Sequence, residues 1–168
     1  MNKSSIVFIG LDTHKDFFEI AHELDGRDNH CIHDGRISSS KSSVIKMARD
    51  FQSQFPDATL HFVYEAGPCG FWLYRYLAKN NIPCWVVAPS LTPKAPGDKV
   101  KTDRRDAVAL AHFLRSGDLA PIHVPDDPVE AMQDLVRARE DAVKTEVQAK
   151  QRLGKYLLRH GRRYRGGK

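Results

Sequence analysis

Cysteine is scarce in this sequence of 168 residues, which contains only Cys31, Cys69 and Cys84. An odd number of widely spaced cysteines without a Cys-x-x-Cys pair predicts free thiols in a reducing cytoplasm, and excludes a disulfide framework. Long apolar runs are also absent. No stretch approaches the roughly 20 residues needed to cross a bilayer, so we expect no membrane contact. The short apolar run at 6–11 is followed by charged residues, which favours a strand over a signal peptide.

Hydrophobic residues make up 41% of the sequence and charged residues 28%, a balance that excludes a disordered chain and predicts a globular one. A chain of 168 residues is long enough for one domain with its own core and a short appendage. We expect the domain to cover residues 1–125 and a helical, basic extension to cover residues 126–168.

Acidic residues are missing from the C-terminal end. From Lys150 onward the sequence has eight basic residues and no acidic one. This charge predicts a polyanionic partner, in the first place nucleic acid, although a solubilising tail would have the same composition. The side chains that we expect to contact nucleic acid here are Arg152, Lys155, Arg159, Arg162, Arg163 and Arg165.

Apolar periodicity and turn signals divide the chain into strands and helices. Strands are predicted at 6–11, 17–24, 29–37, 59–65 and 82–88, and helices at 41–54, 71–80 and 103–115. A long polar helix with a thin apolar stripe is predicted from about residue 129 onward. A hairpin followed by alternating helices and strands predicts an α/β protein with a mixed sheet and flanking helices. This is the order of a ribonuclease-H-like fold, here followed by a long C-terminal helix.

Two acidic residues stand where apolar strands end. Asp12 follows the first strand, and Glu65 ends the strand 59–65. Functional groups of open α/β sheets collect at the carboxyl ends of strands, so the two carboxylates would lie side by side if their strands are neighbours. Alternation places Asp12 on the face of Phe8 and Glu65 on the face of Val63. The sequence leaves open whether these two faces are the same.

A second acidic pair stands at the start of a helix. Asp103 and Asp106 are spaced i, i+3 and share a helix face that continues through apolar residues. We expect this face to point inward, where an unpaired carboxylate is costly unless a cation neutralises it. Three of the acids also have a structural interpretation, because Asp12 could end a strand, Glu65 could belong to a turn, and Asp103 suits a helix that Thr102 caps. Asp106 is harder to explain in this way.

Four carboxylates suit phosphodiester chemistry. Two hard cations about 3.5–4 Å apart activate the nucleophile and stabilise the leaving oxygen, and Mg²⁺ prefers oxygen ligands. We therefore expect Mg²⁺, with Mn²⁺ as a substitute, at a catalytic site made of Asp12, Glu65, Asp103 and Asp106. The basic residues nearby that we expect to meet phosphates are Lys99 and Lys101, in a proline-rich surface loop, and Arg104 and Arg105. A solvated charged loop is the alternative.

Three segments resemble the DEDD transposases of the insertion-sequence one-ten family, to which the Piv-type DNA invertases are related. They are GLDTHK at 10–15, YEAGPCG at 64–70 and KVKTDRRDA at 99–107, and they stand in the same order as in the family. The similarity covers most of residues 5–140. The third segment is the most specific of the three.

The resemblance implies a RuvC-like nuclease domain whose acidic tetrad falls on Asp12, Glu65, Asp103 and Asp106, and which cleaves and transfers DNA strands with Mg²⁺. It also implies a homo-oligomer, either a dimer or a tetramer, a structured noncoding RNA as guide, and a bacterial or archaeal cytoplasm. Family members carry a further C-terminal domain with a serine nucleophile. Because this sequence ends at Lys168, we expect a truncated chain that holds the metal-binding half of the machinery.

Other interpretations remain open at this point. A non-catalytic nucleic-acid-binding module could keep the same fold, and loss of one acid would indicate it, but all four are present. The segment GLDT at 10–13 is similar to the first phosphate loop of the actin-like ATPases, although His14 and Lys15 stand where that loop needs glycine.

Histidines are frequent in the first hairpin and raise the question of a separate metal site. His14, His22, His30, Cys31 and His33 lack the spacing of zinc motifs. We therefore interpret these histidines as surface residues of the hairpin.

Overall fold

A computed structural model of the chain describes residues 6–26, 30–67, 69–93 and 102–164. The chain divides into two units between Val124 and Pro125. Among these residues, the first unit contains the sheet and three helices, and the second contains one long helix. The predicted nucleic-acid contacts Lys99, Lys101 and Arg165 lie outside the described residues.

Five strands form one mixed sheet within the described residues, in the order β3-β2-β1-β4-β5. Their bounds are Ile6–Thr13 (β1), Phe17–Leu24 (β2), Ile32–Ser38 (β3), Thr59–Glu65 (β4) and Cys84–Val87 (β5). The first three strands form an antiparallel meander, whereas β4 runs parallel to β1, and β5 runs parallel to β4. The predicted ribonuclease-H-like fold class, with its mixed sheet and flanking helices, is confirmed.

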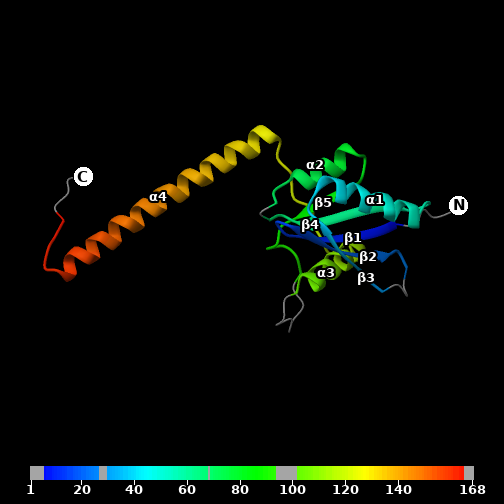
Figure 1. The fold of residues 1–168 in the computed structure, drawn as a ribbon, viewed down its shortest axis with the longest axis horizontal. Helices are drawn as coiled ribbons and strands as arrows, with labels where there is room; N and C mark the ends of the chain where they lie inside the picture. Colours follow the sequence, from blue (N-terminus) through cyan, green and yellow to red (C-terminus); the bar gives the residue numbers. More distant parts are fainter. Residues whose placement is uncertain (1–5, 27–29, 68, 94–101, 165–168) are drawn as a thin grey trace. The chain divides into compact units, whose positions relative to one another are not determined.

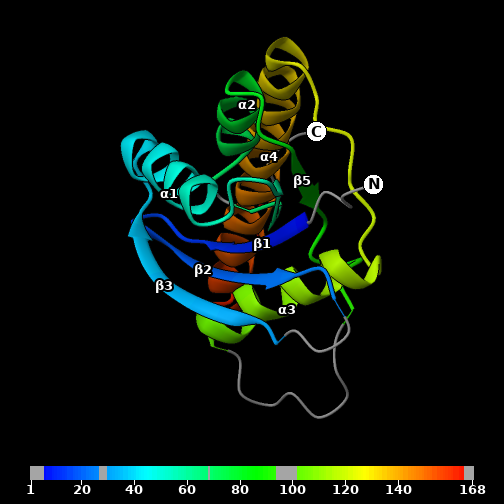
Figure 2. The same cartoon turned by 90° about the vertical axis from the view of Figure 1, so that its right-hand side faces the viewer.

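Helices cover both faces of the sheet (Figures 1 and 2). The helices α1 (Lys41–Gln54) and α2 (Trp72–Lys79) lie on one face, and α3 (Asp103–Ser116) lies on the other. On the α1–α2 face, the core includes Val7, Ile9, Leu11, Val44 and Leu73. A smaller core on the other face contains Val63, Val87, Leu110, Leu114 and Leu119. The central strand β1 is therefore buried on both faces, as its continuous apolar run predicts.

Helix α3 approaches β1 closely because Gly10 has no side chain. A Cβ atom at Gly10 would lie 2.3 Å from the carbonyl oxygen of Ala107 and 2.5 Å from the backbone nitrogen of Ala111. A buried ion pair also joins α3 to the sheet, since Arg115 Nε lies 2.6 Å from an oxygen of Glu23, which is 2% exposed. The position of α3 on the sheet is thus fixed at the middle and at the C-terminal end of the helix.

Local signals define both ends of α3. The Thr102 hydroxyl oxygen accepts a hydrogen bond from the backbone N–H of Arg105 at 3.4 Å, which satisfies one of the free donors of the first turn. Gly117 ends the helix with a φ of 82°, in the left-handed region that favours glycine. The start of α3 is therefore set by a side-chain cap directly before Asp103.

The second unit consists mainly of α4 (Asp127–Arg159), a helix of 33 residues. It begins two residues earlier than predicted because Pro128 fits the first helical turn, where its missing N–H has no partner to lose. The residues of its apolar stripe are exposed, among them Met132, Leu135, Val136, Val143 and Val147. None of the described helices has the length and hydropathy of a membrane span.

Candidate metal centre

The sheet register decides whether Asp12 and Glu65 lie on the same face of the sheet, which the sequence left open. In the parallel pair of β1 and β4, Leu11 lies beside Tyr64, and the next residues along the two strands are Asp12 and Glu65. Neighbours in a parallel pair point to the same face, and adjacent strands lie about 4.8 Å apart. The face of Asp12 is also the face of Gly10, on which α3 packs. Both strand-end carboxylates are thus on the α3 side of the sheet.

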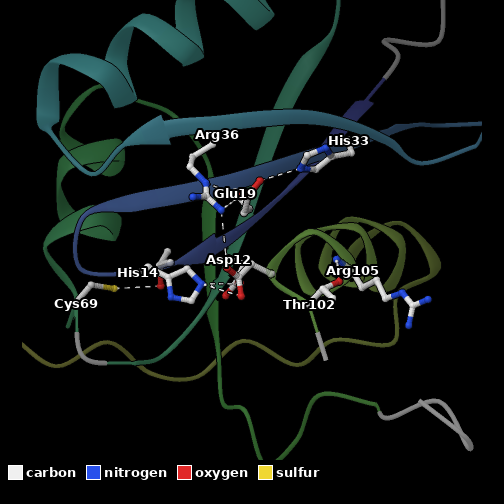
Figure 3. A network of polar contacts seen from close by, with 10 residues as sticks. Asp12, His14, Glu19, His33, Arg36, Cys69, Thr102 and Arg105 are labelled. Atoms are coloured by element: carbon white, nitrogen blue, oxygen red, sulfur yellow. Dashed lines mark hydrogen bonds and ion pairs between the residues drawn. The ribbon is translucent and has the colours of Figure 1, made fainter. Parts of the chain in front are cut away.

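Helix α3 brings Asp103 to Asp12. One oxygen of each carboxylate and a ring nitrogen of His14 all lie within 4.8 Å of one another. His14 Nε2 is 3.0 Å from Asp12 Oδ2 (Figure 3) and 3.5 Å from Asp103 Oδ1, so one ring nitrogen is near both acids. This acidic cluster is half-open to solvent, since the side chain of Asp12 is 21% exposed and that of Asp103 is 44% exposed.

The electrostatics of Asp12 connect it to the second acid of α3. Burial raises the pKa of Asp12 above its usual value, while the charge and hydrogen bond of His14 oppose that rise. The negative charges of Asp106 and Asp103 raise the pKa of Asp12 further. Asp106 is therefore within electrostatic range of Asp12. A cation in the cluster would relieve both the burial and the repulsion between like charges.

The interpretation of the hairpin histidines as surface residues was wrong for His22, whereas the side chain of His14 is 38% exposed. His14 is part of the acidic cluster, and the signal for this is its position two residues after Asp12, which favours the same side of an extended chain. His22 is 3% exposed, and its Nδ1 lies 2.8 Å from Asp34 Oδ2 while its ring meets the Phe51 ring edge-on. His22 therefore belongs to the structural core of the hairpin.

A second polar network reaches the acidic cluster from the meander. Glu19 lies opposite Asp12 in the β1–β2 pair and opposite Arg36 in the β2–β3 pair, so all three share a face. Arg36 Nη2 is 2.6 Å from Glu19 Oε1 and 4.0 Å from Asp103 Oδ2 (Figure 3). The guanidinium also lies 3.7 Å from the centre of the Phe17 ring. Arg36 is thus held in place at the edge of the cluster.

Glu19 is the buried centre of this network. Its side chain is 7% exposed, and one of its oxygens lies 2.8 Å from His33 Nε2. Burial alone would raise the pKa of Glu19, but the hydrogen bonds and charges of His33 and Arg36 outweigh it and lower the pKa. Sequence reasoning missed Glu19 and Arg36 because no motif contains them. Strand alternation and the hairpin register together would have placed them on the face of Asp12.

The predicted basic contacts that are described lie on exposed surfaces of both units. Arg104 and Arg105 are exposed in the first turn of α3, next to Asp103. In the second unit, the exposed basic residues are Arg152, Lys155 and Arg159 near the end of α4, and Arg162 and Arg163 just after it. Their exposure leaves them accessible to a polyanion.

Comparison with known proteins decides the family. Residues 9–161 match the sequence profile of the DEDD transposases of the IS110 type, described as transposase. The chain belongs to this transposase family. The candidate transposase y4qE of Sinorhizobium fredii is 42% identical to this transposase-family chain over 159 residues, which are 95% of the chain and 40% of the relative. The resemblance seen in the three sequence segments is therefore confirmed.

Two further comparisons describe the extent of the match. The transposase for insertion sequence element IS1533 of Leptospira borgpetersenii is 33% identical over 155 residues, covering 91% of the chain and 44% of the relative. The transposase-family chain thus spans less than half the length of these two curated relatives. Among solved structures, Thermus thermophilus RuvC in complex with a Holliday junction substrate aligns with a TM-score of 0.46 and 14% identity, over 70% of this chain and 99% of that one.

Proposed function

We propose that the first unit is the metal-dependent catalytic domain of a transposase and cleaves DNA phosphodiester bonds at Asp12, Glu65, Asp103 and Asp106. The observation that carries this proposal is the convergence of Asp12 and Asp103 within 4.8 Å, at the end of β1 and the start of α3. Asp106 lies within electrostatic range, and Glu65 follows on the neighbouring strand and the same face. Membership of a transposase family supports DNA as the substrate.

The chemistry of the donor set fits a divalent cation. Carboxylate oxygens are the ligands that Mg²⁺ prefers, and the adjacent imidazole of His14 is compatible with Mn²⁺ as a substitute. When bound, such a cation would polarise a phosphate oxygen and activate the attacking nucleophile. Burial and the charges of Asp106 and Asp103 raise the pKa of Asp12, and a bound cation would offset both.

Basic residues of the chain would orient the DNA around this centre. Arg36 is held by Glu19 and lies 4.0 Å from Asp103, so it would help to position that carboxylate. Arg104 and Arg105 are exposed beside the cluster and would contact phosphates that flank the cleaved bond. The exposed basic end of α4 would add a contact that does not depend on sequence.

Transposition by the whole protein would need further components besides the proposed metal centre. We propose strand transfer, a structured noncoding RNA guide and a homo-oligomer, dimer or tetramer, as properties of the whole transposase. The serine nucleophile would come from a further C-terminal domain, as in the family that the sequence segments resemble. The non-catalytic module remains the alternative, and cation binding separates it from the proposal.

Titration with Mn²⁺, followed by electron paramagnetic resonance, tests the metal centre. We expect wild-type protein to bind Mn²⁺, and we expect Asp12→Asn, Glu65→Gln, Asp103→Asn and Asp106→Asn each to weaken binding by at least about tenfold, equivalent to about 1.4 kcal/mol. Asp134→Asn is the matched control, because Asp134 is an exposed acid on α4 paired with Arg137. Mn²⁺ affinity equal to that of wild type in all four variants would refute the metal centre.

Cleavage assays on the intact transposase test the catalytic role. Alanine at Asp12, Glu65, Asp103 or Asp106 should abolish cleavage of DNA without unfolding the domain, which circular dichroism would check. Retained cleavage in one variant would remove that residue from the site.

A further inference from the structure

A pocket adjoins the acidic cluster at the carboxyl end of β1. Its volume is about 420 Å³, within the roughly 300–1,000 Å³ range of small-molecule pockets and large enough for one nucleobase. Two of the residues that line it, His14 and Lys15, belong to the β1–β2 turn, and Phe18 belongs to β2. Ser39 lies between β3 and α1, Cys69 lies before α2, and Trp72 begins α2.

The pocket has an aromatic wall. Trp72 is half-buried and stacks on Phe18 with ring centroids 6.1 Å apart and an angle of 29° between the planes. Phe18 is fully buried and supports the indole from the core. A supported, partly exposed indole offers a flat apolar surface on which a planar ring can stack.

Polar groups surround this wall. The Lys15 side chain is exposed and supplies a positive charge, and the Ser39 hydroxyl donates a hydrogen bond to the carbonyl oxygen of Lys15 at 2.7 Å. Cys69 also lines the pocket, and its Sγ lies 3.3 Å from Thr13 Oγ1 (Figure 3). An aromatic surface combined with a cation and small polar groups is typical of sites that bind a base and its adjacent phosphate.

His14 connects the pocket with the acidic cluster. Its Nε2 lies between Asp12 and Asp103, and the same residue lines the pocket. Thr13 and Phe18 are paired residues of β1 and β2, next to the pair of Asp12 and Glu19. Strand alternation therefore puts the pocket wall on the opposite face from the acids, at the same end of the sheet. A DNA strand that crosses this end can place a phosphate at the acids and a neighbouring base in the pocket.

We propose that this pocket binds one unpaired nucleobase of the DNA strand whose phosphate meets the acidic cluster. The proposal rests on the proposed function, because that function brings a DNA strand to the end of β1. Stacking on the Trp72 indole requires a base that is extruded or already single-stranded, because a paired base is stacked within its own duplex.

Tryptophan fluorescence tests the pocket without changing it. The chain has two tryptophans, and Trp85→Phe leaves Trp72 as the only reporter. Titration of this variant in Mg²⁺ with a short single-stranded oligothymidine should quench Trp72. An abasic oligonucleotide of the same length and charge should bind at least about fivefold more weakly and leave the fluorescence unchanged. Equal quenching by both, or quenching by neither, would overturn the proposal.

Affinity measurements with matched variants give a second test. Trp72→Leu should weaken binding of the oligothymidine by about 5- to 100-fold, the range expected for loss of one stacked base. Trp85→Leu is the control, because Trp85 packs in the core on the α3 face, away from the pocket. Equal affinities of the two folded variants would contradict the proposal. If Trp72→Leu fails to fold, the fluorescence result decides.

Mn²⁺ titration separates this proposal from the proposed function. Normal Mn²⁺ binding without base-dependent quenching overturns the pocket and leaves the metal centre standing. Base-dependent quenching without Mn²⁺ binding supports the pocket and overturns the metal centre.

Discussion

Individual charged side chains at the end of β1 are balanced by specific partners. Asp12 and Asp103 share His14, whereas Glu19 has Arg36 and His33. The surroundings of the two carboxyl groups shift their pKa in opposite directions: the pKa of Asp12 is raised and that of Glu19 is lowered. A lowered pKa indicates a carboxylate whose charged form is stabilised by the fold, and a raised pKa indicates a carboxylate whose charged form is disfavoured.

Glu19→Gln should destabilise the first unit by about 2 kcal/mol at neutral pH, because hydrogen bonds to a charged group are lost inside the protein. Glu19 has a folded pKa below the ordinary value of 4.5, so its stabilising contribution is complete above pH 4.5. The contribution disappears as pH falls through the folded pKa. Urea unfolding of both proteins between pH 7 and pH 3 should therefore show a difference that shrinks below about pH 4.5.

Glu146→Gln is the control for this measurement. Glu146 forms an ion pair with Lys150 on α4, but it is fully exposed, so its loss should change stability little. A difference between wild type and Glu19→Gln that stays constant down to pH 3 would show that the Glu19 carboxylate is not stabilised by its charge.

Helix α3 is the element that brings the acids of the candidate centre together. Its distance from β1 depends on Gly10, and its first turn depends on the Thr102 cap. Both features act on backbone positions, so changes there should move Asp103 and Asp106 without altering any proposed ligand.

Gly10→Ala should displace α3, because the added Cβ would collide with helix backbone at 2.3 Å and 2.5 Å, and backbone cannot move aside as a flexible side chain can. We expect a loss of roughly 1–3 kcal/mol in thermal unfolding, with weaker Mn²⁺ binding. Gly154→Ala in α4 is the matched control, since a Cβ there meets nothing within 4 Å. That change should leave the first unit and its Mn²⁺ affinity as they are. Equal behaviour of the two variants would contradict the close packing of α3 on β1.

Thr102→Ala should lower stability by about 1 kcal/mol through loss of the N-cap and should also weaken Mn²⁺ binding, because the cap directly precedes Asp103. Ser40→Ala removes the corresponding cap of α1, where the hydroxyl accepts from the Ser43 N–H at 3.2 Å. Its stability loss should be similar, but its Mn²⁺ affinity should match wild type. Calorimetry of metal binding on both variants compares the two caps, and equal Mn²⁺ affinities would show that the cap does not position Asp103.

The whole chain has a markedly uneven charge distribution. Acids converge at one end of the sheet in the first unit, and basic residues gather at the end of the second unit. The first arrangement attracts cations, and the second attracts polyanions. Nucleic-acid affinity should therefore depend on the second unit even when the metal centre is inactivated.

Replacing Arg152, Lys155 and Arg159 by glutamine should weaken binding of single-stranded DNA and flatten its salt dependence. Each lost phosphate contact should reduce the slope of log affinity against log salt by about 0.7. Lys144→Gln is the control, because Lys144 lies 3.8 Å from Asp141 and 4.0 Å from Glu140 and is balanced by these acids. Fluorescence anisotropy over a salt series measures the affinity and its salt dependence for each variant. A wild-type affinity that does not change with salt would refute this role of the basic end.

Sequence alone determined the elements of the fold and the identities of the acids. The apolar runs of β1 and β4, the turn signals, and the Thr102 and Gly117 boundaries of α3 are local features, so they can be read from neighbouring residues. The three motif segments were sufficient for the family, which the comparison then confirmed. The assignment of Asp12, Glu65, Asp103 and Asp106 to one catalytic site stays a prediction.

Only the tertiary structure decided which groups meet. The parallel register of β1 and β4 puts Asp12 and Glu65 on one face, and the absence of a side chain at Gly10 lets α3 carry Asp103 to Asp12. His14 and Arg36 entered the site through the same packing. Most of these contacts join residues far apart in the chain. They depend on strand pairing and helix packing, which the sequence of one segment does not show. Burial then sets the pKa of Asp12, because the cost of a charge depends on the solvent that the surrounding elements exclude.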